Sequence, residues 1–187
     1  MESTKTRNIL IPVRMKAFSG KNTELSITQA KGSFPCQYTF HLLLDGKILG
    51  SLFTDSEDTE IIKKEIIANV REKNQSKILK YYTESDNNFI IIQVKVHPAF
   101  LNTGVGTILC EAALFVLSKY PNSSVTLNAS PLSDTGRTVF GLESFYSHIG
   151  FDTIVDEKEY KIMFIPSLNG YTPIINKTLM VYAPTAS

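Results

Sequence analysis

The clearest hydrophobic pattern in the chain is an apolar segment, Phe89–Val96, followed by a turn and a segment with helical periodicity. The apolar segment is rich in β-branched residues and alternates only in part, which predicts a strand covered on both faces. His97-Pro98 ends it, and a short polar turn with Gly104 and Gly106 follows. Apolar residues then recur every three or four positions, the core stripe of an amphipathic helix: Val105, Ile108, Leu109, Ala112, Ala113, Val116, Leu117 and Tyr120.

This order of strand, glycine turn and helix predicts either an anion-binding site or a tight connection without a ligand. The first N–H groups of a helix lack acceptors within the helix, and the helix dipole adds partial positive charge there. The two standard nucleotide signatures are absent: Leu109 occupies the third glycine position of a dinucleotide turn, and no Gly-Lys-Ser/Thr occurs. Glycine spacing alone leaves both interpretations open.

The pattern elsewhere in the chain predicts further strands and helices around this segment. Strands are predicted over Asn8–Met15, Leu25–Ile27, Gln37–Leu44, Lys47–Phe53, Ser124–Ala129, Phe151–Val155, Tyr160–Ile165 and Thr178–Tyr182. Asp45-Gly46 suits a type I′ hairpin turn. Helices are predicted over Asp55–Asn74, with an apolar stripe from Ile61 to Val70, and over Arg137–His148, ended by Gly150. Lys80–Asn88 is predicted to be a charged loop.

Composition narrows the protein class. The chain has 187 residues, 43% hydrophobic and 20% charged, which suits one globular domain. A net charge of +1 gives no basic surface for nucleic acid. No apolar run approaches the roughly 20 residues of a membrane span, and Met1–Arg7 lacks a signal-peptide core. Cys36 and Cys110 suggest reduced thiols in the cytoplasm, and the histidines and cysteines lack metal-ligand spacing, so no metal is expected.

Two motifs resemble those of a known family. Val96–Leu109 looks like the coenzyme-A-binding motif of the GNAT N-acetyltransferase superfamily, in which a strand passes through a proline and an Arg/Gln-x-x-Gly-x-Gly/Ala turn into a helix. Pro98 and the two glycines match, whereas Leu101 replaces the usual Arg or Gln. Phe145–Phe151 is similar to the family's aromatic-Tyr-x-x-x-Gly-Phe motif. The resemblance covers residues 89–165, and the two motifs in this order are more specific than either alone.

The resemblance implies an α/β (α+β) fold: a GNAT-like mixed, splayed central β-sheet flanked by helices, in one domain over residues 1–187. The helix at residues 55–75 would then be an insertion or a relocated element. The implied function is transfer of an acetyl group from acetyl-CoA to a primary amine of a small-molecule or protein acceptor, directly in a ternary complex. A non-catalytic CoA-binding module acting in regulation or partner binding is the alternative, and an interaction protein with an empty cleft is a third. Homodimerisation is left open.

The resemblance also assigns site residues. The residues implied to bind acetyl-CoA lie on the strand and the turn: Val94, Val96, Leu101, Asn102, Thr103, Gly104, Val105, Gly106 and Thr107. Tyr146 is the expected proton donor to the CoA thiolate, because a phenol keeps its proton at neutral pH. The general base is unresolved among His97, Glu143, His148, Glu84 and Asp86, with His97 closest to the expected thioester. His41 is assigned to packing or surface.

Overall fold

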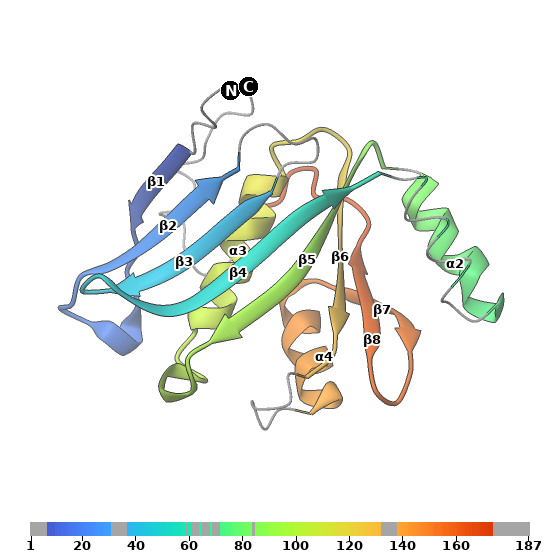
Figure 1. Ribbon diagram of the computed structural model, residues 1–187. Coiled ribbons are helices and arrows are strands. Elements are labelled where there is room, and N and C mark those ends of the chain that lie inside the picture. The colour runs from blue at the N-terminus through green and yellow to red at the C-terminus, as the bar shows by residue number, and fades with distance from the viewer. Residues whose placement is uncertain are drawn as a thin grey trace. The chain divides into compact units, whose positions relative to one another are not determined.

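The computed structural model of the protein (Figure 1) describes residues 7–30, 37–58, 60, 64, 68, 72–83, 85–131 and 138–173. Its elements are β1 (Arg7–Pro12), η1 (Lys16–Phe18), β2 (Thr23–Gln29), β3 (Tyr38–Leu44), β4 (Lys47–Glu57), α2 (Glu72–Thr83), β5 (Asn87–Val96), η2 (Pro98–Phe100), α3 (Val105–Leu117), β6 (Ser123–Ala129), α4 (Val139–Ile149), β7 (Asp152–Asp156) and β8 (Lys161–Ile165).

The chain forms two compact units that are interleaved in sequence. The first unit consists of Met1–Asp55, Ile92–Lys119 and Gly170–Ser187, and the second of Ser56–Ile91 and Tyr120–Asn169. One domain over residues 1–187 therefore stays a prediction.

The strands follow the hydrogen-bonded order β1-β2-β3-β4-β5-β6-β8-β7. Neighbours from β1 to β4 are antiparallel, β5 and β6 are parallel, and β6, β8 and β7 are antiparallel. The parallel pairing of β5 with β6 begins with Asn87 opposite Ser123 and ends with Ile91 opposite Leu127. Both strands continue past the last of these pairs, β5 to Val96 and β6 to Ala129. The predicted mixed, splayed sheet with flanking helices is confirmed.

The first unit is an antiparallel sheet with α3 on one face. At the hairpin turn, Asp45 has φ 49° and Gly46 has φ 78°, as a type I′ turn requires, so the predicted hairpin is confirmed. The α3 face of the sheet carries fully buried apolar side chains: Leu25, Phe40, Leu42 and Leu52. At Gly50 an added Cβ would lie 2.8 Å from Val105 Cγ1, which places the start of α3 directly against β4.

The helix α3 differs from its predicted amphipathic pattern. The predicted stripe is buried from Val105 to Leu117, but so are Cys110, Glu111, Leu114 and Phe115 between those positions. The helix is therefore buried on every side along most of its length, as an apolar helix in a core is. Tyr120 lies beyond its end and is only half-buried.

The second unit contains α2, α4 and the strands β6, β8 and β7, together with the first half of β5. Its core includes Ile78 on α2, Ile154 and Val155 on β7, and Phe164 on β8. The boundaries predicted for α2 are wrong in part, because β4 extends to Glu57 and the helix continues through Thr83. Lys80–Asn88 is accordingly no continuous loop. The apolar stripe from Ile61 to Val70 lies outside the described residues.

Three further predictions meet different outcomes. The closing strands β7 and β8 and the helix α4 lie where the sequence predicted them, with Gly150 at φ 113° as the left-handed cap. Thr178–Tyr182 falls outside the described residues. Coverage of Phe89–Val96 on both faces is wrong for its second half, since Ile92 is 61% exposed.

Candidate functional site

The glycine turn of the first unit connects β5 to α3 through two residues of left-handed backbone. After η2, Asn102 adopts φ 62° and Gly104 adopts φ 89°. Thr103 Oγ1 donates to Phe100 O at 2.6 Å, which closes the turn on itself. A left-handed conformation costs glycine little, so the turn needs a glycine at 104 for its shape.

The start of α3 presents backbone donors. The first helical hydrogen bond runs from Ile108 N to Gly104 O at 3.1 Å. The N–H groups of Val105, Gly106 and Thr107 precede that ladder, which is the arrangement that binds anions at helix N-termini. An added Cβ at Gly104 would meet no atom within 4 Å, so space remains beside these donors. The turn therefore has the backbone donors and the open space that a bound anion requires.

The turn is anchored to β4. His97 N donates to Leu49 O at 2.9 Å, and an added Cβ at Gly50 would also lie 2.8 Å from Lys95 O. On the other side, the Phe100 ring meets Phe18 edge-on, with centroids 5.7 Å apart. These contacts fix where the end of β5 and the first turn of α3 lie within the unit.

His97 lies at the entrance to the turn and is exposed. Ala99 N donates to its Nδ1 at 3.3 Å, and its ring lies 5.6 Å from that of Phe100. A neutral imidazole that accepts at Nδ1 carries its hydrogen on Nε2. In this tautomer neither ring nitrogen has a free lone pair.

Tyr146 belongs to the second unit, on the last turns of α4, and is 8% exposed. Its ring packs between Phe145, at 4.9 Å, and Phe151, at 5.9 Å between centroids. Phe151 N donates to Tyr146 O at 3.1 Å where Gly150 caps the helix. The aromatic motif thus forms a packed helix end, with Phe151 in the core as predicted.

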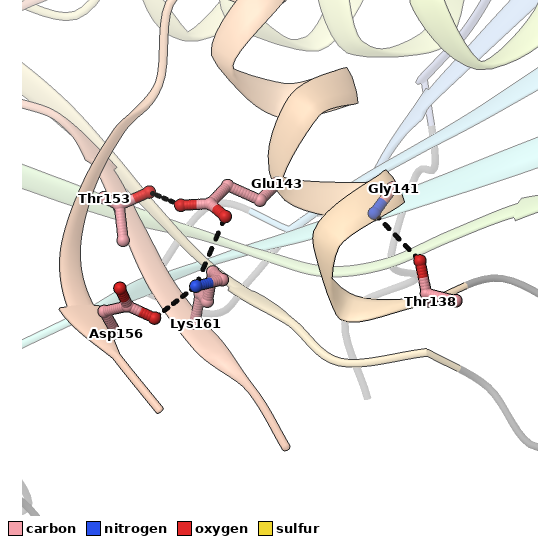
Figure 2. A network of polar contacts seen from close by, with 6 residues as sticks. All are labelled: Thr138, Gly141, Glu143, Thr153, Asp156 and Lys161. Atoms are coloured by element: carbon pink, nitrogen blue, oxygen red, sulfur yellow. Dashed lines mark hydrogen bonds and ion pairs between the residues drawn. The ribbon is translucent and has the colours of Figure 1, made fainter. Parts of the chain in front are cut away.

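Glu143, one turn before Tyr146 on α4, is part of a polar network with β7 and β8 (Figure 2). Thr153 Oγ1 donates to its Oε1 at 2.8 Å, and Lys161 Nζ lies 3.2 Å from its Oε2. Lys161 also bonds Asp156, and this hydrogen bond raises the pKa of Lys161 above its ordinary value. Both oxygens of Glu143 have partners, so the network argues against a general base at this position.

The remaining base candidates have local partners or lie outside the described residues. His148 is exposed and its Nδ1 donates to Ser144 O at 2.6 Å. Asp86 accepts from Asn122 Nδ2 at 2.7 Å. Glu84 is not among the described residues.

His41, assigned from the sequence to packing or surface, is half-buried on β3. It stands opposite Ser51 across the β3–β4 pair, and its Nδ1 lies 2.7 Å from Ser51 Oγ. Burial lowers the pKa of His41 from its ordinary value. The alternation of β3 places it on the face away from Phe40 and Leu42, a signal that the sequence does contain. Its cross-strand partner depends on register, which the sequence does not show.

The cysteine and metal predictions concern groups outside the turn. Cys110 is a free thiol, fully buried in α3, and burial raises its pKa. It is therefore no nucleophile at neutral pH. Among the residues that the structure describes, no three His, Cys, Asp or Glu side chains come together as a metal site. Nor does any helix in the described part reach the length and apolarity needed to cross a membrane.

The predicted site residues divide between the two units. His97 and the predicted CoA-binding residues from Val94 to Thr107 lie together in the first unit, on β5, η2 and the start of α3. Tyr146 lies in the second unit. Their roles stay predictions.

Comparison with known proteins finds likeness in structure alone. No family model matches the sequence, and no curated protein sequence matches it. Arabidopsis thaliana Naa50 in complex with the bisubstrate analogue CoA-Ac-MVNAL is 12% identical, with a TM-score of 0.43 over 68% of this chain and 71% of that chain. The PaiA N-acetyltransferase of Thermoplasma acidophilum, in complex with coenzyme A, is 12% identical, with a TM-score of 0.45 over 68% of this chain and 59% of that chain.

A third solved structure is the loading GNATL domain of CurA from Lyngbya majuscula. It is 17% identical, with a TM-score of 0.45 over 67% of this chain and 74% of that chain. Because all three TM-scores lie below 0.5, the function proposed below rests on this chain's own residues.

Proposed function

We propose that this protein is an acetyl-CoA-dependent N-acetyltransferase that acts on a primary amine of a small molecule or a protein. The observation that carries the proposal is the turn from His97 to Thr107. There the backbone of Gly104 is left-handed, and the first N–H groups of α3 lie beside open space. The acetyl-CoA motif that the sequence resembles occupies the same residues.

The turn would bind the pyrophosphate of acetyl-CoA through backbone N–H groups. Val105, Gly106 and Thr107 supply donors, and the helix dipole adds partial positive charge. Leu101, at the position where the resembled family has Arg or Gln, is half-buried and contributes no side-chain charge. We therefore expect binding that depends on backbone geometry more than on ionic strength.

The transfer itself requires polarisation of the carbonyl and a proton for the departing thiolate. The second half of β5, at the half-buried Val94 and Val96, would pair with the pantetheine and donate to the carbonyl oxygen. Tyr146 would protonate the thiolate, a role supported by its motif and by the acidity of a phenol. His97 stays a candidate base, with the limitation that its Nδ1 already accepts from Ala99 N. A cytoplasmic location stays a prediction.

A second function is favoured by one observation. Leu101 removes the charged or amide side chain expected in the turn, which would suit a CoA-binding module without turnover that acts in regulation or partner binding. This alternative predicts binding of acetyl-CoA with no thiol release in the presence of amines.

The test is calorimetric titration of the full chain with acetyl-CoA and with coenzyme A. We expect both to bind, and we expect Gly104→Glu to abolish binding because it places a like charge and a strained backbone in the turn. The matched control is Gly46→Glu, which strains an exposed hairpin turn of similar φ, 78°, in the same unit. A wild-type protein that binds neither ligand would refute the proposal.

A further inference from the structure

His41 and Ser51 form a hydrogen-bonded pair on the face of the first unit's sheet that α3 does not cover. The two residues lie directly opposite each other across β3 and β4, and the distance of 2.7 Å from His41 Nδ1 to Ser51 Oγ is that of a well-formed hydrogen bond. Phe40 and Leu42, on either side of His41, are fully buried on the α3 face. Because strand side chains alternate, His41 lies on the opposite face.

That face combines the polar pair with apolar neighbours. The Phe53 ring meets the His41 ring edge-on, with centroids 6.2 Å apart. Leu10 on β1 and Ile48 on β4 are each 54% exposed. In the described part of this unit α3 is the one α-helix, and Figure 1 shows it along the other face of β1–β4. The pair is therefore flanked by apolar side chains on a face that no described α-helix of its own unit covers.

The imidazole of His41 is suited to accept a proton. The described charged residues on the two strands beside β3 are Glu24 on β2 and Lys47 and Asp55 on β4, and Lys95 lies on β5 beyond them. Burial, rather than any of these charges, lowers its pKa, so the ring is neutral at neutral pH. When Nδ1–H donates to Ser51 Oγ, the lone pair of Nε2 is free.

The pair is tied to the end of β5 that leads into the glycine turn. Ser51 directly follows Gly50, whose added Cβ would lie 2.8 Å from Lys95 O. Leu49, one residue earlier, accepts from His97 N. The strand that carries Ser51 thus contacts the part of β5 expected to hold the acetyl-bearing arm of acetyl-CoA.

We propose that His41, held by Ser51, accepts the proton of the acceptor amine, and that the acceptor is a primary amine on an apolar chain. This inference rests on the proposed acetyltransferase function. Phe53, Leu10 and Ile48 favour an aliphatic or aromatic carrier over a polycation, and Ser51 is a positioning residue that fixes the tautomer of His41.

The proton balance is complete without a further reactant. One proton passes from the ammonium nitrogen to His41 Nε2. The nitrogen lone pair then forms the C–N bond as the C–S bond breaks, and the thiolate takes a proton from water. The amide nitrogen releases its second proton to solvent as the bond forms, which replaces the proton given to the thiolate. The products are the acetamide, the free thiol of coenzyme A and one net proton.

The test measures thiol release by the full chain with acetyl-CoA and three amines: benzylamine, hexylamine and spermidine. We expect the two apolar amines to be acetylated in preference to spermidine. His41→Gln should lower kcat/KM by about 10²–10⁴-fold and remove the acidic limb of its pH profile, with acetyl-CoA affinity unchanged by calorimetry. Ser51→Ala should shift that limb with a smaller loss, and Ser51→Thr should restore it.

Matched histidine variants separate the inference from its alternatives. His148→Gln, at an exposed histidine bonded to its own helix, should leave the rate and the pH profile unchanged. If His97→Gln removes the acidic limb while His41→Gln does not, the inference is refuted and the acetyltransferase function stands. Acetyl-CoA binding without turnover of either apolar amine also refutes it, whereas a protein that binds no acetyl-CoA refutes the proposed function as well.

Discussion

The glycine turn of the first unit and the Glu143–Lys161 network of the second unit are built on opposite principles. The turn is made of backbone: left-handed residues at 102 and 104, helix N–H donors, and a carbonyl of β4 that receives His97 N. The network is made of side chains that bring α4, β7 and β8 together at 2.8 and 3.2 Å. A site made of backbone can be recognised in the sequence by its glycines and its proline. A side-chain network cannot be recognised in this way, because its residue types are common on any surface.

The largest effect should come from the one catalytic side chain that the motif assigns. We expect Tyr146→Phe to lower kcat by about 100-fold or more, because the phenol that would protonate the thiolate is lost. Its ring contacts with Phe145 and Phe151 remain, so acetyl-CoA affinity and the melting temperature should stay close to wild type. Thiol-release kinetics and calorimetry check this, with Phe145→Leu as the packing control. An unchanged kcat would assign the proton to another donor.

The second prediction concerns the packing that supports the turn. Gly50→Ala should destabilise the protein by about 1–3 kcal/mol, because overpacking against a fixed backbone forces displacements. The added Cβ would lie 2.8 Å from both Lys95 O and Val105 Cγ1. Urea denaturation measures the change in the free energy of unfolding.

A glycine of the second unit supplies the contrast to Gly50. Gly141 is exposed in the first turn of α4, and its added Cβ would meet one atom, Thr138 Oγ1 at 3.3 Å. Because Thr138 is exposed, its Oγ1 has room to shift by the few tenths of an ångström that this contact requires. On that condition Gly141→Ala should stabilise the protein by up to about 1 kcal/mol, as alanine does in a helix. Equal destabilisation by the two substitutions would remove the claim that the first unit depends on close backbone approach.

Much of the fold could be predicted from the sequence, because the deciding signals were local. The Asp45-Gly46 turn fixes its hairpin, and apolar periodicity identifies β5 and α3. The ends of the helix predicted over Asp55–Asn74 were wrong because an apolar stripe gives no sharp end: β4 extends to Glu57, and α2 runs to Thr83. Burial of α3 on every side could not be predicted, since Glu111 interrupts its apolar pattern and is nonetheless 2% exposed.

The candidate site was predictable to the extent that it consists of backbone. The turn can be recognised in the sequence itself by Pro98, Gly104 and Gly106. The partners of His41 and Glu143 depend on registers between residues 10 and 18 positions apart, and no periodicity encodes those. The sequence therefore predicted the shape of the glycine turn and left the general base unresolved.

The third prediction tests how far α4 depends on single side chains. Thr138 Oγ1 accepts from Gly141 N at 3.1 Å and caps the helix (Figure 2). Thr138→Ala should cost about 1 kcal/mol of stability, and Thr138→Ser should restore it because serine caps equally well. Thermal unfolding measures both. A loss that serine fails to restore would show that the threonine methyl, rather than the cap, matters.

The smallest effect should be electrostatic, and its sign depends on pH. The hydrogen bond to Asp156 raises the pKa of Lys161 in the folded protein above that of the unfolded chain. The stabilisation is therefore fully present below the ordinary lysine pKa of about 10.4 and is lost as pH rises through the folded value. Lys161→Met should remove this alkaline loss, whereas Lys158→Met, at an exposed lysine between β7 and β8, should retain it. Denaturant midpoints from pH 7 to pH 11 for the three proteins decide the point: parallel curves would show that the network contributes no pH-dependent stability, and that α4 is held by its apolar contacts and its caps alone.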